Sequence, residues 1–425
     1  MLSERVVHLR SGLTLPVLIV GLGGGLIGAA YVGLLHLLQR WLWPTHHTAL
    51  VQLAILVAVG ITVALIARLG GDSGNVEILV DNIHLLGGAD DPRRTIPLVP
   101  SSLLCVAAGG GMGPEAPLVQ ATGTFGTWIG DRLHCDRTDV RVLTITGMAG
   151  GLTVLFGAPL GAALFALEIL HRRGLQYYEA LLPALIGSLF GYGVYVALTG
   201  VGIEPVWKFP PIGALHGVDL LAAVGLGLVA GVASLVFVMV SRVLRRMYRF
   251  VPSSVRPVVG GLVLGLLAFW SPYALTFGEA QLGGLLTAKL TIGALAVAVT
   301  AKLAGTTVTM ASEWKGGFII PLFFMGAAMG QIAHQLVPAL SEPVAMAAMM
   351  AALCTGVLKT PLGATLVVTE MAGIPVLAVT VIAAVVALLV TSPLTLIETQ
   401  RARDPRPGES EPGRSDDVQW PGRKP

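Results

Sequence analysis

Runs of apolar residues too long for the core of a soluble protein recur along this chain. A helix needs about 20 apolar residues to cross a bilayer core of about 30 Å. Seven stretches approach or exceed that length, at residues 13–38, 49–69, 178–198, 218–240, 258–275, 292–310 and 375–394. Only 12% of the residues are charged, whereas soluble proteins have about 25%. The sequence therefore predicts an all-α polytopic membrane protein.

Between these runs lie apolar pieces that are too short to span a membrane or are broken by Gly and Pro. They fall at residues 97–110, 117–130, 142–156, 159–170, 320–336, 343–358 and 361–371. Broken helices at membrane depth are tolerated only where their ends face protein or an aqueous cavity. Transporters build their binding sites from such half-helices. The pattern therefore favours tilted and broken helices around a transport site over a simple bundle.

Two motifs recur in the same order in the two halves of the chain. The frame G-x-x-x-P-L begins at Gly113 and again at Gly317, 204 residues later. The string P-L-G-A begins at residues 159 and 361, and the copies lead to Glu168 and Glu370. Apolar sequence also produces chance matches, but two ordered motifs at nearly one spacing indicate an internal repeat. The equivalent positions of the two glutamates favour a structural role such as helix capping.

The repeat divides the chain into two transmembrane halves with short ends. We expect a cytoplasmic N-terminus (1–12), a first half (13–215), a second half (216–398) and a disordered cytoplasmic tail (399–425). Basic clusters at 131–141, 172–173 and 242–249 are expected on the cytoplasmic side, because loops rich in Lys and Arg stay inside. These features predict a multi-pass protein of the cell's inner (plasma) membrane.

A glycine followed by a proline and an apolar helix marks a helix start in each half. Gly113 precedes Pro117, and Gly317 precedes Pro321. The unpaired amides of a first helical turn carry about half a positive charge and form a ready anion site. A third break, at residues 70–78, offers the hydroxyl of Ser73. Taken singly, the glycines fit tight helix packing, but three breaks together favour an anion site.

Glu115 lies inside the first break, and the matching residue of the second half is Ile319. A carboxylate at membrane depth is costly and marks a functional site by default. As an anion it can take the place of a permeant anion, and protonation would release it. One residue would then gate the pathway and carry a proton. The alternative is a glutamate facing the surface at a helix start, where acids are favoured in any case.

In order along the chain, these motifs resemble those of CLC chloride channels and transporters. The family motifs GSGIP, GREGP and GIFAP are matched here by DSGNV (72–76), GPEAP (113–117) and GFIIP (317–321). The segments FGAPL (156–160) and KTPL (359–362), each leading to a glutamate, also resemble the family, and the resemblance extends over about residues 15 to 395. It implies two inverted-topology halves in each subunit of a homodimer, with one pore per subunit.

The resemblance also implies roles for individual residues. The hydroxyl of Ser73 and the backbone amides of Phe318 and Ile319 would hold chloride, and Glu115 would be the external gate. Many exchangers of the family carry an internal proton glutamate where this chain has Ile169. Thr395 is the nearest match to a tyrosine that helps to close the inner site.

The sequence departs from the family motifs at three further positions. Pro114 and Ala116 replace the usual Arg and Gly, and Val76 replaces a proline. The local backbone of the second motif is therefore expected to differ from the family pattern.

We therefore expect a carrier of chloride and similar small anions, and we favour a chloride/proton antiporter gated by Glu115. A passive anion channel and a fluoride-selective carrier of the same family remain open. An intramembrane enzyme with Glu115 as general base would need a second polar catalytic group, and the sequence offers no evident one. The expected partners are the anion, protons, membrane lipid and a second copy of the chain, with no cofactor, metal or nucleic acid.

Overall fold

The computed structural model describes residues 12–43, 48–70, 76–89, 92–171, 177–199, 206–213, 215–397 and 399–400. Within these residues the chain forms 16 α-helices and three short 3₁₀ helices, and it has no strand. Eight of the helices are long and apolar enough to cross a membrane. The all-α polytopic fold expected from the sequence is confirmed.

The helices of the first half vary widely in length. They are α1 (Thr14–Leu42), α2 (Ala49–Gly70), α3 (Val76–Leu86), α4 (Pro92–Ala107), α5 (Glu115–Arg132), α6 (Arg137–Phe156), α7 (Pro159–Glu168), η1 (Tyr178–Ala180) and α8 (Leu181–Thr199). The second half consists of α9 (Gly217–Tyr248), α10 (Arg256–Trp270), η2 (Pro272–Ala274), α11 (Glu279–Leu285), α12 (Ile292–Ala311), α13 (Ile319–Leu336), α14 (Glu342–Leu358), α15 (Pro361–Ala372), η3 (Ile374–Val376) and α16 (Leu377–Thr391).

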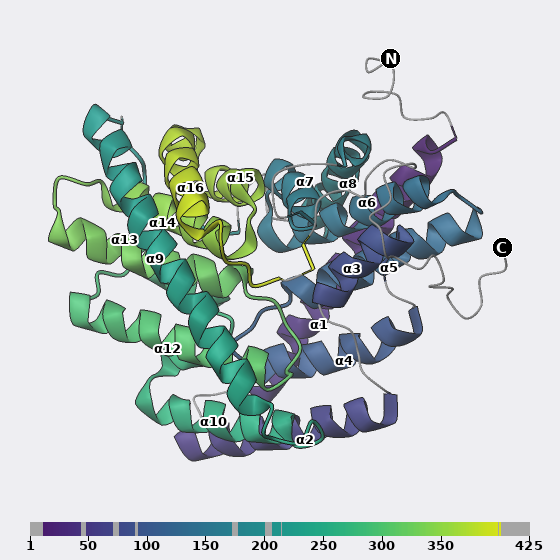
Figure 1. The fold of residues 1–425 in the computed structure, drawn as a ribbon, viewed down its shortest axis with the longest axis horizontal. Helices are drawn as coiled ribbons and strands as arrows, with labels where there is room; N and C mark the ends of the chain where they lie inside the picture. Colours follow the sequence, from purple (N-terminus) through teal and green to yellow (C-terminus); the bar gives the residue numbers. More distant parts are fainter. Residues whose placement is uncertain are drawn as a thin grey trace.

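The order of elements in the first half is repeated in the second. α5 and α13 have 18 residues each, and each is followed by a longer or similar helix, a short helix, a 3₁₀ turn and an apolar helix. In Figure 1, α5, α6 and α8 lie on the right and α12, α13 and α14 on the left, with α7 and α15 between them. α7 packs against α15, so the two halves meet through equivalent helices.

Helices of the first half approach one another through glycines. A Cβ added at Gly21 of α1 would lie 2.7 Å from the Cα of Gly187 in α8, and one added at Gly25 would lie 2.8 Å from the Cα of Gly191. Lipid offers no hydrophobic gain for helix association, so such close backbone contact is a main source of packing energy. Replacing these glycines by larger residues would force the two helices apart.

One helix that crosses the core, α6, is longer than its apolar sequence suggests. The sequence indicated a short piece at 142–156, whereas α6 runs over Arg137–Phe156 and is capped by the side chain of Asp136, which accepts from Asp139 N at 2.8 Å. Its threonines lower the apparent hydrophobicity. Thr144 and Thr153 hydroxyls donate to helix carbonyls four residues back, at 2.8 and 2.9 Å, so their polar groups are satisfied within the helix.

The expected span at 258–275 was too long, because α10 ends at Trp270. A short 3₁₀ turn follows, and Thr276 N then donates to Gly109 O at 2.8 Å. The chain leaves the helix there to pair with the segment that precedes α5. This pairing brings the two halves together close to the helix starts singled out in the sequence.

Candidate functional site

The two repeated helix starts meet backbone to backbone. Gly113 N donates to Gly317 O at 2.7 Å, and Gly317 N donates to Gly113 O at 2.6 Å, which makes an isolated antiparallel bridge. α5 begins two residues after Gly113, and α13 begins two residues after Gly317. The positive ends of two helix dipoles therefore lie side by side inside the protein.

The Glu115 carboxyl group binds a backbone amide of the opposite half. Its side chain is 1% exposed, and Oε1 accepts a hydrogen bond from Ile320 N at 2.6 Å. Ile320 lies in the first turn of α13, where backbone amides have no partner within the helix. Oε2 is buried and has no hydrogen-bond partner among the described residues. A carboxylate thus lies where a free anion would bind.

A small chamber lies against the Glu115 carboxyl group. Its volume is about 30 Å³, room for about two water molecules or one small ion. Both halves contribute to its wall, including Ala116, Ile169, Phe318, Ile319, Leu358 and Ile397. The wall is otherwise apolar, so the carboxyl group and the backbone amides are the polar features of the chamber.

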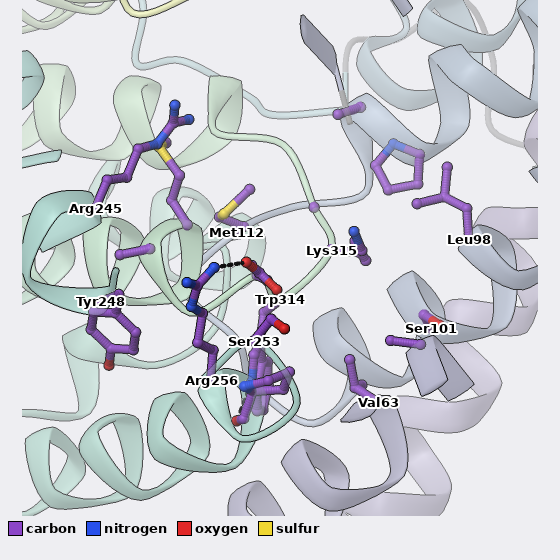
Figure 2. A pocket seen from close by; sticks show the side chains of 18 of the residues that line it. Val63, Leu98, Ser101, Met112, Arg245, Tyr248, Ser253, Arg256, Trp314 and Lys315 are labelled. Atoms are coloured by element: carbon purple, nitrogen blue, oxygen red, sulfur yellow. Dashed lines mark hydrogen bonds and ion pairs between the residues drawn. The ribbon is translucent and has the colours of Figure 1, made fainter. Parts of the chain in front are cut away.

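A second and much larger pocket, of about 940 Å³, adjoins this chamber. Ala116, Phe318 and Ile397 line both spaces, so the two meet at these residues. Figure 2 shows Arg245, Arg256 and Lys315 around the large pocket, which we call the vestibule.

The vestibule carries more basic than acidic side chains. Its lining includes Arg68, Arg245, Arg249, Arg256 and Lys315 but only the acids Glu77 and Glu313. Arg245 pairs with Glu77 at 2.9 Å, and Arg256 pairs with Glu313. A concave surface with excess positive charge concentrates anions at its base. The vestibule thus forms an electrostatic approach to the chamber.

The structure brings most of the predicted site residues together. Glu115, Phe318 and Ile319 line the chamber, and Gly113 and Gly317 form the bridge beside it. Pro117 and Pro321 lie in the first turns of α5 and α13. Ser73 falls in 71–75, outside the described residues.

Thr395 is absent from the described lining of the chamber, which Ile397 reaches instead. α16 ends at Thr391, and the chain beyond it is not helical, so residue spacing from a helix no longer predicts which side chain faces the site. Thr395 is buried elsewhere, and its carbonyl accepts from an Arg242 guanidinium nitrogen at 2.9 Å. The motif around Pro393 gives Thr395, whereas the side chain of this segment that lines the chamber is Ile397. A role for Thr395 in anion binding stays a prediction.

Glu168 and Glu370 each cap the start of a helix in the opposite half. Glu168 accepts from Leu362 N at 3.1 Å and Gly363 N at 2.6 Å, at the start of α15. Glu370 accepts from Leu160 N at 3.1 Å and Gly161 N at 2.7 Å, at the start of α7. The two-fold pattern of these bonds matches the repeat in the sequence. Helix capping is thus what these carboxylates do in the structure.

The segment after α16 was missed as part of the site. Thr399 donates to Glu77 O at 2.8 Å, and Gln400 donates to Ile169 O at 2.9 Å and Leu358 O at 2.8 Å. Both residues belong to the stretch that the sequence assigned to the tail. Gln400 thus connects the ends of α7 and α14, and its backbone N donates to Ile397 O at 3.4 Å. A run of polar residues gives no sequence signal for such contacts.

Comparison with known proteins agrees with this geometry. Residues 73–392 match the family described as voltage gated chloride channel. The chain is 27% identical over 417 residues to the chloride/fluoride channel protein of Pseudomonas syringae pv. tomato, which covers 93% of this chain and 87% of that relative.

Two solved structures share the fold. A slow cyanobacterial Cl⁻/H⁺ antiporter superposes with a TM-score of 0.78 at 21% identity, covering 90% of this chain and 95% of that one. A CLC-type fluoride/proton antiporter superposes with a TM-score of 0.78 at 24% identity, covering 92% and 98%. Since the family match spans most of the sequence and the fold agrees, the chain belongs to the voltage-gated chloride channel (CLC) family and is an anion transport protein rather than an enzyme.

Proposed function

We propose that the chain exchanges chloride and similar small anions for protons, with Glu115 as the gate. The observation that carries this proposal is the 2.6 Å bond between Glu115 Oε1 and Ile320 N. It holds a titratable carboxyl group on the backbone donors of the opposite half. A permeant anion arriving from the vestibule needs the same donors, so the anion and the carboxylate compete for one position.

Protonation switches this competition. A hydrogen bond to a charged acceptor contributes about 1.5–3 kcal/mol and a neutral one about 0.5–1.5 kcal/mol. Adding a proton to Glu115 therefore weakens its bond to Ile320 N by about 1–1.5 kcal/mol, or roughly tenfold in occupancy. The anion then takes the freed donors. Partial charges suit this exchange, because a site for a permeant ion must bind and also release it.

Phe318 and Ile319 contribute through their backbone, at the start of α13. Both line the chamber, and neither side chain offers a polar group. We assign their amides to the anion, with the Ser73 hydroxyl as a further donor. The basic vestibule supplies anions to this position.

Glu115→Gln tests the gate. Glutamine keeps the size and an acceptor oxygen but cannot titrate, so we expect anion flux to persist and linked proton movement to vanish. Purified protein in liposomes, with chloride efflux and internal pH recorded together, gives both quantities. Glu342→Gln is a matched control, because Glu342 also starts a helix but is absent from the described lining of the chamber. Chloride-driven proton uptake that continues in Glu115→Gln rules out the gate.

A passive channel is the second candidate, and one observation favours it. Ile169 lines the chamber where exchangers of the family carry a second carboxyl group, so no side-chain acid faces Glu115 from that position. In the unsubstituted protein, chloride efflux without any pH change would identify a channel.

Fluoride is an alternative substrate of the same site. One relative is named a chloride/fluoride channel protein, and one structural neighbour is a fluoride/proton antiporter. Efflux measured in parallel with internal chloride and with internal fluoride decides between the two anions. We favour chloride and expect its efflux to be the faster.

We propose that the protein works as a homodimer in the inner membrane, with lipid around its apolar faces. Exposed apolar side chains along α9, such as Leu221, Val229 and Met239, suit contact with acyl chains. The vestibule arginines and the C-terminal segment share one side, which the positive-inside bias assigns to the cytoplasm. Mass measurement of the detergent-solubilised protein tests the dimer.

A further inference from the structure

Two buried histidines and a tyrosine form a cluster next to the chamber. His84 is 4% exposed, His171 is fully buried and Tyr177 is 1% exposed. His84 Nδ1 lies 2.7 Å from the Tyr177 hydroxyl oxygen, and His84 Nε2 lies 2.6 Å from Leu170 O. The His171 ring lies 5.3 Å from the His84 ring and 4.6 Å from the Tyr177 ring, centre to centre.

The cluster adjoins the chamber through two elements. Leu79 and Val80 of α3 line the chamber, and His84 lies one helical turn beyond Val80. Ile169, at the end of α7, also lines the chamber, and His171 follows two residues later. Only one short stretch of protein on each element therefore separates the imidazoles from the space in front of Glu115.

The other side of the cluster approaches the surface away from the vestibule. The exposed Arg137 donates to Leu85 O, and Arg141 donates to Ile83 O at 3.2 Å, both at the end of α3. α3 meets the vestibule at its opposite end, through Glu77. A proton that enters beside Arg137 would thus follow a path separate from that of the anion.

Charged groups around the cluster favour passage of a proton over its retention. The Arg141 guanidinium carbon lies 4.5 Å from the centre of the Tyr177 ring, and this ring is the one that neighbours both imidazoles. Asp81 lies one turn before His84, and Glu168 one turn before His171, where its carboxylate caps α15. Histidine is the side chain that gains and loses a proton most readily near neutral pH. The cluster therefore joins a titratable group to a site that lacks an inner carboxyl group.

We propose that His84 and His171 relay protons between cytoplasmic water and Glu115, a role that rests on the proposed proton exchange. A neutral imidazole takes up a proton from the cytoplasmic side and becomes an imidazolium. Because neither imidazole lines the chamber, the imidazolium passes a proton to a transient water between the cluster and the chamber, and from there it reaches water in the chamber. That water protonates the Glu115 carboxylate, so the acid forms as the imidazole returns to its neutral state. The Tyr177 hydroxyl orients His84 through the bond to Nδ1.

The test is the double variant His84→Gln with His171→Gln in the full chain, reconstituted in liposomes. Glutamine can donate to Leu170 O and Leu167 O as the imidazoles do, but it does not titrate. We expect the number of protons moved per chloride to fall by about tenfold or more, as for the loss of a general acid–base group. Chloride efflux is expected to stay near that of the parent. His334→Gln is the control, because His334 contacts Leu340 O at the far end of α13.

The outcomes separate the relay from the gate. A double variant that moves protons at the parental ratio overturns the relay and leaves Glu115 as the gate. Proton movement that survives in Glu115→Gln overturns the gate instead. An unsubstituted protein that moves chloride without protons overturns both, and anion transport stands. If the double variant does not fold, Tyr177→Phe is the test, because it removes only the hydroxyl group that bonds His84 Nδ1. The relay predicts fewer protons per chloride in Tyr177→Phe, and an unchanged ratio would overturn it.

Discussion

Glu168→Gln should loosen the junction between the two halves. In the native protein both carboxylate oxygens accept backbone N–H groups, from Leu362 at 3.1 Å and Gly363 at 2.6 Å. Glutamine offers one acceptor oxygen and turns its NH₂ group towards the other amide. One bond to a charged acceptor therefore becomes a neutral bond, and the second bond is lost.

The expected cost follows from the two bonds. Replacing a charged by a neutral acceptor costs about 1–1.5 kcal/mol, and a buried amide left without a partner costs about 1–3 kcal/mol. The free energy of unfolding should thus fall by about 2–4.5 kcal/mol. Glu370 makes the same pair of bonds to α7, but it is more exposed. Water can replace its lost bond, so only the change from a charged to a neutral acceptor remains, and Glu370→Gln should cost about 1–1.5 kcal/mol.

Unfolding in mixed micelles with a rising fraction of denaturing detergent measures both values. Glu342→Gln serves as the reference, because Glu342 lies in the first turn of α14. Equal losses for Glu168→Gln and Glu370→Gln would refute the reasoning, because the argument assigns the difference to burial. A loss of anion flux in correctly folded Glu168→Gln would show that this carboxylate does more than cap α15.

Two further substitutions probe the site. Gly317→Ala should reduce proton coupling by about tenfold, because the new Cβ would lie 2.6 Å from Glu115 Oε2 and push the carboxylate away from Ile320 N. Gly293→Ala, where the Cβ would have no atom within 4 Å, is the control, and full coupling in Gly317→Ala would contradict the reasoning. Ile397→Ala should raise chloride efflux by about threefold, which corresponds to a barrier lower by roughly 0.65 kcal/mol, since Ile397 lines both the chamber and the vestibule. Thr395→Ala should leave efflux unchanged; a change in Thr395→Ala but not in Ile397→Ala would show that Thr395 belongs to the site.

The sequence predicted the fold class and the helix starts because both depend on local chemistry. Long apolar runs determine which segments enter the membrane, and Gly followed by Pro marks where a helix begins. The repeat then indicated that Gly113 and Gly317 are equivalent. Their mutual bonding appeared only in the structure, because sequence similarity does not say that two equivalent segments touch.

Features that depend on tertiary contacts were missed or misplaced. Nothing near His84 in the sequence points to His171, because 87 residues separate them and neither belongs to a motif. Ile397 lies beyond the last helix, so helical periodicity could not distinguish it from Thr395. α6 was underestimated because hydropathy counts its threonines as polar, although Thr144 and Thr153 bond within the helix.

In the bridge between Gly113 and Gly317, each glycine donates to and accepts from the other, so the contact is two-fold symmetric and requires the same backbone from both segments. A chain of half this length could therefore satisfy it by pairing with its own copy. Such a pair would carry identical residues at both helix starts, and two carboxylates crowded at one centre would repel each other. Joining the halves in one polypeptide removes that constraint. The equivalent positions can then differ, with Glu115 in the first half and Ile319 in the second, so the symmetric backbone carries a single acid.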